Sequence, residues 1–197
     1  MSGNRKVYLK SIVRLDSTDP DFRSLLSPME ARRMGRLLKR AVWTSREALR
    51  QAGIEKPDAI ITATDYGCMV NSVEFLKAVL GTDDTPMRPI HFMQSTHNTI
   101  SSVIGVYLGC HGYNTTYSHK GSSLESALLD AWMQIRSGAI ESALVGWFDE
   151  YEPVFAESLL SRGITLEDRA VSMVLSSSDK DAVREVAPPF NSNDYVK

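Results

Sequence analysis

The spacing of apolar and polar positions divides the chain into strand-like and helix-like segments. Alternating positions or short apolar runs predict five strands, at 5–14, 59–64, 114–118, 143–145 and 170–176. Apolar or small residues recurring on one helical face predict four helices, at 28–52, 73–80, 95–108 and 122–137. Because strands and helices alternate along the chain, we expect an α/β fold with a mainly parallel, mixed sheet and helices on both faces.

Capping and turn residues mark the predicted boundaries. Ser27 and Glu30 have the spacing of a capping box, and Asn71 precedes Glu74 with the same spacing. Glycines 53, 81, 109 and 138 are expected to end helices. We predict one domain over residues 1–186 and a loose C-terminal tail over residues 187–197, which contain Pro-Pro and several Asn and Ser residues.

Composition limits the classes of function. The chain has 22 Lys and Arg against 24 Asp and Glu, so its net charge of −2 gives no general attraction to nucleic acid. Its 43% of hydrophobic residues are enough to build a core. No apolar run approaches the roughly 20 residues that span a bilayer. No signal peptide is visible, so we expect a cytoplasmic protein in which Cys68 and Cys110 stay reduced.

Residues 98–149 carry a family resemblance. Asn98 begins a helix that ends in Leu108-Gly109-Cys110-His111-Gly112, Ser137-Gly138 ends the next helix, and Ala143-Leu144-Val145-Gly146 follows as a strand. This order resembles the N-terminal half of β-ketoacyl synthases, and Arg32 to Ile54 resembles the first long helix of that family. The resemblance covers about residues 7–175 and implies a thiolase-like half-fold.

The sequence departs from the family at the nucleophile. Counting forward from Gly112 or back from Gly138 places Gly121 where the family has its catalytic Cys. The resemblance also implies two catalytic histidines from a C-terminal half, and this sequence ends where that half would begin. Because glycine cannot be acylated, we predict that the chain does not condense acyl thioesters.

Other candidate chemistry is weaker. Ser122 with His119 offers an alternative nucleophile and base, although a serine before a helix is more often an N-cap. Cys110 is expected to pack rather than react. His91 and His97 have no Cys or carboxylate at ligand spacing, so neither a metal nor another cofactor is expected.

Two segments suggest partners. The first long helix carries a basic cluster, whose simplest interpretation is a solvent-exposed helix face. The resemblance implies that this cluster binds an acidic acyl carrier protein. The cluster consists of Arg32, Arg33, Arg36, Lys39 and Arg40. The resemblance further implies that one strand pairs with its mate across a dimer, homodimeric or heterodimeric with a ketosynthase subunit. The residues of that strand are Asn114, Thr115, Thr116, Tyr117 and Ser118.

The favoured hypothesis is therefore a non-catalytic, β-ketoacyl synthase-like subunit of fatty-acid or polyketide-type biosynthesis. It would pair with an active synthase or bind acyl carrier protein, with no role at nucleic acid or within a membrane. Two alternatives stay open: an active synthase or acyltransferase that uses Ser122 and His119, and an interaction module without any link to lipid.

Overall fold

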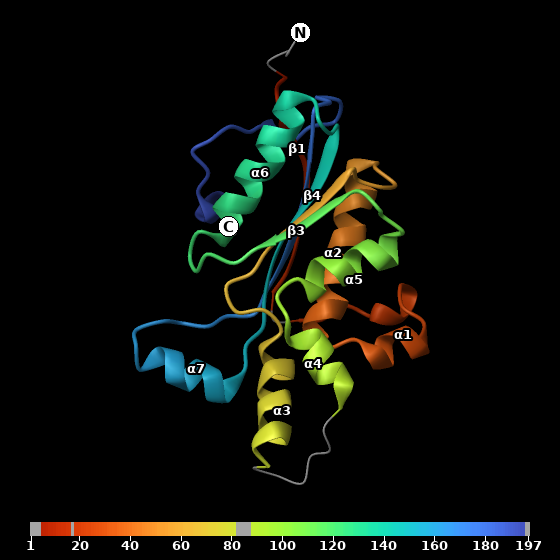
Figure 1. Ribbon diagram of the computed structural model, residues 1–197. Coiled ribbons are helices and arrows are strands. Elements are labelled where there is room, and N and C mark those ends of the chain that lie inside the picture. The colour runs from red at the N-terminus through yellow and green to blue at the C-terminus, as the bar shows by residue number, and fades with distance from the viewer. Residues whose placement is uncertain (1–4, 17, 82–87, 196–197) are drawn as a thin grey trace.

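A computed structural model describes residues 5–16, 18–81 and 88–195 (Figure 1). Its centre is a six-stranded sheet with the order β3-β2-β4-β5-β1-β6. The strands are β1 (Tyr8–Leu15), β2 (Ala59–Ala63), β3 (Tyr113–Tyr117), β4 (Ser142–Asp149), β5 (Arg169–Ser176) and β6 (Arg184–Glu185).

The strand directions confirm the predicted mixed, mainly parallel sheet. β2 pairs in parallel with both β3 and β4. β5 runs antiparallel to both β4 and β1, so β1 shares the direction of β2, β3 and β4. Only the short β6 runs the same way as β5, because it pairs antiparallel with β1.

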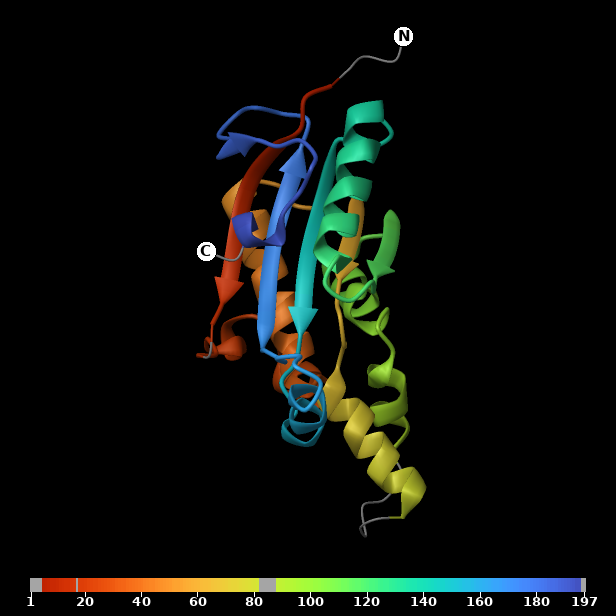
Figure 2. The ribbon, with the colours of Figure 1, turned by 90° about the vertical axis from the view of Figure 1, so that its left-hand side faces the viewer.

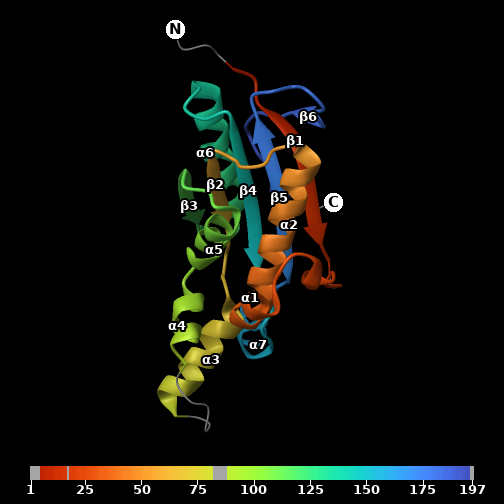
Figure 3. The ribbon, with the colours of Figure 1, turned by 90° about the vertical axis from the view of Figure 1, so that its right-hand side faces the viewer.

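Helices cover both faces of the sheet, as predicted. α6 (Ser123–Ser137) packs on one face (Figure 2), and α2 (Arg36–Ala52) and α5 (Thr99–Leu108) pack on the other (Figure 3). Side chains of β4 alternate between the two cores: Val145 and Trp147 lie on the α6 side, whereas Leu144 and Phe148 lie on the α2 side. This alternation follows from the two-residue period of a strand that is buried on both faces.

Several shorter helices lie beyond the lower end of the sheet in Figure 1: α3 (Met69–Leu80), α4 (Pro89–Ser95) and α7 (Pro153–Leu160), with α1 (Pro28–Arg33) beside α2. The sequence did not predict α4 or α7. Each begins with a proline in its first turn, and α7 is capped by the Glu152 side chain, which accepts the Phe155 N–H at 2.8 Å.

Three predicted boundaries differ. The capping box at Ser27 and Glu30 is present, but the helix predicted over 28–52 breaks where Met34 adopts an extended conformation before Gly35. α3 begins at Met69, and Asn71 bonds to His91 instead of capping the helix. The helix predicted from residue 95 begins at Thr99.

Within the predicted loose tail, residues 187–195 are mostly exposed but are anchored at their end. Tyr195 is only 3% exposed and joins the core on the α6 side. Its carbonyl oxygen accepts a hydrogen bond from Arg14 Nε at 2.8 Å, and the Ser192 N–H donates to the Glu125 carboxylate at 2.9 Å. Residues 196 and 197 lie outside the described part of the chain. No helix in the described ranges is both long and apolar enough to cross a membrane.

Candidate functional site

The candidate site lies where parallel strands β2, β3 and β4 end. The carboxyl ends of parallel strands meet at one edge of a sheet, which is the usual place for ligands in α/β folds. Thr64 and Asp65 follow β2, and Asp149 ends β4. The chain leaves β3 through residues 118–122 and enters α6 at this same edge, so Gly121 and the first turn of α6 lie beside Asp65.

Gly121 has a positive φ of 78°, a backbone conformation that favours glycine. A Cβ atom built there would meet no other atom within 4 Å, so the position faces open space. The Gly121 N–H donates to Asp65 Oδ1 at 3.2 Å. Asp65 Oδ1 also accepts a short hydrogen bond from the Ser123 hydroxyl, and Ser123 Oγ accepts the His119 N–H at 2.9 Å.

Asp149 organises the other side of this site. Its Oδ1 accepts three hydrogen bonds, each 2.9 Å long, from the Thr64 hydroxyl and from the Asp65 and Tyr66 N–H groups. Asp149 is 1% exposed, and this burial raises the pKa of its carboxyl group. Its Oδ2 has no hydrogen bond within the described residues but lies 3.7 Å from Arg169 Nη1.

Arg169 is the cation of the site. Its Nη1 lies 4.0 Å from Asp65 Oδ2 and 3.7 Å from Asp149 Oδ2, and its guanidinium stacks over Trp147 at 4.3 Å from the ring centroid. Its Nη2 also lies 3.3 Å from the Glu167 carboxylate. One guanidinium thus lies near three carboxylates, so its charge is shared among them.

The chemical requirements of acyl transfer can be compared with this geometry. Such a reaction needs a nucleophile and N–H donors that are free to stabilise a developing oxyanion. Gly121 has no side chain to acylate, and its N–H is already bound to a carboxylate. The Asp65 charge stands where an incoming negative charge would need donors.

The two cysteines lie elsewhere. Cys68 is buried, and burial, followed by the nearby Glu150 carboxylate, raises the pKa of its thiol to about 12. The Cys110 thiol donates to the Pro57 carbonyl at 3.1 Å. The raised pKa of Cys68 disfavours the reactive thiolate, and the Cys110 thiol is engaged with a backbone carbonyl.

The structure does not bring Ser122 and His119 together as a nucleophile and base. His119 Nδ1 lies 3.0 Å from Ser126 Oγ, and no hydrogen bond joins His119 to the Ser122 side chain in the described residues. Ser122 stands at the N-cap position of α6 as predicted, but its side chain makes no capping bond. The hydroxyl of Ser123 is instead the one that links the start of α6 to the preceding loop.

The basic cluster does not form one solvated face. Arg40 is 1% exposed and its Nε lies 3.1 Å from Asp19, while Arg36 bonds to Asp19 at 2.7 Å and to Asp168 at 2.5 Å. These pairs link α2 to the loop after β1 and to the start of β5. Of the remaining members, Arg32 and Arg33 are exposed and Lys39 is half-buried.

The strand predicted to pair across a dimer is an edge strand of the described sheet. The Tyr117 carbonyl accepts the Thr64 N–H at 3.0 Å, so the backbone groups of Tyr117 and Thr115 face β2. Those of Asn114 and Thr116 therefore face the open edge. Ser118 lies just beyond the end of β3.

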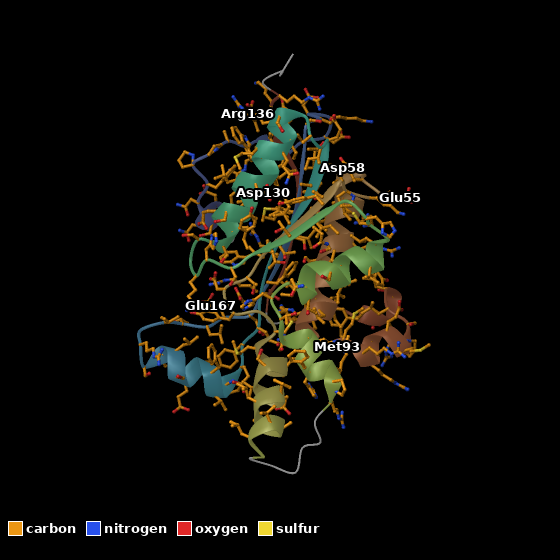
Figure 4. All side chains as sticks on the ribbon, viewed as in Figure 1. Glu55, Asp58, Met93, Asp130, Arg136 and Glu167 are labelled. Carbon is orange, nitrogen blue, oxygen red and sulfur yellow. The ribbon has the colours of Figure 1, made fainter. Side chains whose placement is uncertain are left out.

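Side chains hold β3 from both faces. Thr116 Oγ1 lies 2.8 Å from Thr62 Oγ1 and 3.0 Å from Ser101 Oγ. On the opposite face the Tyr113 hydroxyl donates to Asp130 at 3.1 Å. Figure 4 labels Asp130 on α6. β3 is thus fixed in place while its outer backbone groups stay available.

No group of three or more His, Cys, Asp or Glu side chains in the described part of the chain could hold a metal ion. The two histidines considered in the sequence have other neighbours: His91 Nδ1 lies 3.2 Å from Asn71 Oδ1, and the His97 ring lies against Gly67. Sequence reasoning missed Asp65, Asp149 and Arg169. The available signal was their position at the ends of apolar strands.

Comparisons with known proteins point to one family. The family model described as "Beta-ketoacyl synthase, N-terminal domain" matches residues 10–193. The comparison with curated proteins gave no significant match.

Solved structures share the fold at low sequence identity. A chain from the complex of a ketosynthase with its chain length factor from Xenorhabdus doucetiae is 16% identical, with a TM-score of 0.72 over 88% of this chain and 79% of that one. A β-ketoacyl synthase from Burkholderia phymatum STM815 is 14% identical, with a TM-score of 0.71 over 89% of this chain and 60% of that one. A chain from a complex of a type II polyketide synthase acyl-carrier protein with its ketosynthase bound to the hexaketide is 13% identical, with a TM-score of 0.73 over 88% and 63%. The chain thus spans less than two thirds of the latter two.

Proposed function

Because the chain belongs to the β-ketoacyl synthase N-terminal domain family, we propose that it is a non-catalytic, ketosynthase-like subunit of fatty-acid or polyketide-type biosynthesis in the cytoplasm. The residue at the family's nucleophile position carries this proposal. Gly121 offers no atom that could form a thioester, and its N–H donates to Asp65. A chain with this fold and this substitution serves its pathway through association.

The partner is a second ketosynthase-type chain that pairs along β3. The backbone groups of Asn114 and Thr116 face the open edge, and an unpaired edge strand is a ready template for another strand. The related complex from Xenorhabdus doucetiae joins a ketosynthase to a chain length factor. We assign this chain a role like that of the non-condensing member of such a pair, with a homodimer as the competing arrangement.

Within the basic cluster, only the exposed residues are proposed to bind acyl carrier protein. Arg32 and Arg33 at the end of α1 are free to meet an acidic surface. Arg36 and Arg40 are engaged with Asp19 and Asp168, so their role is structural.

Thioester turnover tests the proposal. We expect the purified chain to release no product from malonyl and acyl thioesters, with or without the Ser122→Ala substitution. We also expect a ketosynthase to accompany it in purification from native extract. Turnover by the chain alone that is lost in Ser122→Ala would establish the alternative, a serine-dependent acyltransferase.

Light scattering after size-exclusion chromatography tests the pairing. We expect a mass of at least two chains, or of a complex with the accompanying ketosynthase. A monomer at high concentration that retains no ketosynthase would refute pairing through β3.

A further inference from the structure

We propose that Asp65 is a built-in blocking group whose carboxylate binds the Gly121 N–H and the Ser123 hydroxyl and thereby disfavours thiolates and acyl oxyanions at position 121. The inference rests on the proposed non-catalytic function and adds a second barrier to it. Gly121 removes the nucleophile, whereas Asp65 makes the position unsuitable for one. The two barriers are separable because they reside in different side chains.

The first argument is the occupation of donors. The Gly121 N–H, in the loop before α6, and the Ser123 hydroxyl, on the first residue of α6, both donate to Asp65 Oδ1. An intramolecular carboxylate holds these donors at a far higher effective concentration than any external anion.

The second argument is that Asp65 cannot easily move away. Its own N–H donates to Asp149 Oδ1 at 2.9 Å, and its side chain is only 11% exposed. Asp149 also holds the flanking Thr64 hydroxyl and Tyr66 N–H. The turn after β2 is thus fastened to the end of β4, and this fastening fixes the direction of the Asp65 side chain.

The third argument is charge. Arg169 faces Asp65 from β5, but it is shared with Asp149 of β4 and with Glu167. His119 and Lys120 precede Gly121 in the loop, and Glu125 lies in the first turn of α6. An anion at position 121 therefore meets the Asp65 carboxylate, which the shared Arg169 neutralises only in part.

An introduced thiol tests the block. Gly121→Cys places a sulfur in open space, because a Cβ there meets nothing within 4 Å. We compare Gly121→Cys with the double variant Gly121→Cys/Asp65→Asn by alkylation with iodoacetamide across pH, using peptide mapping to separate the new thiol from Cys68 and Cys110. We expect the double variant to have a thiol pKa about one unit lower and to react about tenfold faster at pH 7.

Two further variants keep the result decisive. Ser122→Cys, with and without Asp65→Asn, repeats the comparison at a residue with an ordinary φ of −129°, in case the positive φ of residue 121 prevents folding. Glu157→Gln in the Gly121→Cys background removes an exposed carboxylate on α7 and should leave the rate unchanged. His119, Lys120 and Glu125 are the same in every arm.

The outcomes separate the inference from the proposed function. Equal or slower alkylation after Asp65→Asn, in whichever thiol background folds, would overturn the blocking role of Asp65 and leave the proposed function intact. Thioester turnover by the unsubstituted chain would overturn the proposed function, whatever the alkylation rates. Faster alkylation in the Asp65→Asn arm alone would support the inference.

Discussion

The carboxyl ends of the strands and the outer edge of β3 differ in whether their polar groups have partners within the molecule. At the strand ends, Asp65 and Asp149 satisfy backbone N–H and hydroxyl donors from three elements, and Asp168 and Asp19 pair with buried or half-buried arginines. At the edge, the backbone of Asn114 and Thr116 points away from β2 with no strand beside it in the described sheet.

This contrast indicates what the fold is organised to do. An enzyme of this kind keeps polar groups unsatisfied at its reacting centre, because they must bind charge that appears during the reaction. Here Asp65 Oδ1 and Asp149 Oδ1 accept hydrogen bonds from their own surroundings, while Asp149 Oδ2 faces Arg169 without a hydrogen bond in the described residues. The backbone groups on the outer edge of β3 face no neighbouring strand of the described sheet, and such an edge suits another strand. The Asp65 and Asp149 carboxylates are thus paired within the molecule, whereas the outer edge of β3 has no strand partner in the described sheet.

The largest expected effect is a loss of stability when Arg40 is replaced. Its guanidinium is almost fully buried and bridges Asp19 and Asp168, so Arg40→Met leaves these carboxylates with fewer partners in a poorly solvated place. Loss of one member of a buried pair costs about 3 kcal/mol of unfolding free energy. Urea denaturation of the variant checks this value.

Arg33→Met is the matched control, because Arg33 is an exposed arginine just before α2. We expect little change in its unfolding free energy, but weaker binding to immobilised acyl carrier protein. Equal stability losses in the two variants would contradict the division of the basic cluster into structural and exposed members.

The next largest expected effect is weaker association when the outer edge of β3 is changed. Thr116→Pro removes a backbone N–H that faces away from β2, so it should spare the sheet while weakening association at least about tenfold, a level typical of an important interface group. Sedimentation of the chain, and of its complex from native extract, measures the change.

Thr116→Val is the control for the lost hydroxyl. It removes the contacts of Thr116 with Thr62 and Ser101 but keeps the N–H. We expect association close to that of the unsubstituted chain. An equal loss in both variants would show that the side chain, and not the strand edge, supports association.

The sequence predicted the parts of this contrast that depend on local pattern. The apolar runs placed β2, β4 and β5, and the helical period placed α2 and α6, because burial on one or two faces leaves a clear period. β3 was also located, although its position at the edge came only with the family resemblance. Strand order depends on contacts between distant segments, which period alone does not encode.

The same limit explains what was missed. Asp65, Asp149 and Arg169 are far apart in sequence and meet only because β2, β4 and β5 are neighbours. The sequence predicted that Arg36 and Arg40 belong to a basic surface, because their partners, Asp19 and Asp168, lie on other parts of the chain. The C-terminal segment was predicted to be loose because a single residue, Tyr195, supplies its main buried contact.

The smallest expected effect is a pH dependence of stability from Asp149. Burial raises the pKa of its carboxyl group above the ordinary value of 3.8, so the native state holds this proton more tightly than the unfolded chain does. The resulting stability is fully present below pH 3.8 and is lost as the pH rises through the native pKa. Asp149→Asn does not titrate, so we expect its unfolding free energy to rise relative to that of the unsubstituted protein as the pH increases from 4 to 7 in urea denaturation.

Asp168→Asn is the matched comparison, because the pKa of Asp168 is shifted in the opposite direction to that of Asp149. Burial alone would raise the pKa of Asp168, but the Tyr151 N–H and the Arg36 guanidinium outweigh burial and lower it. Its stabilising effect is therefore present above pH 3.8 and is lost only as the pH falls through the lower native pKa, so the Asp168→Asn difference should stay level from pH 4 to pH 7. Parallel curves for the two variants would mean that Asp149 is as well solvated or paired as Asp168. The start of α6 would then be an open polar surface like the β3 edge, and the contrast between the two regions would disappear.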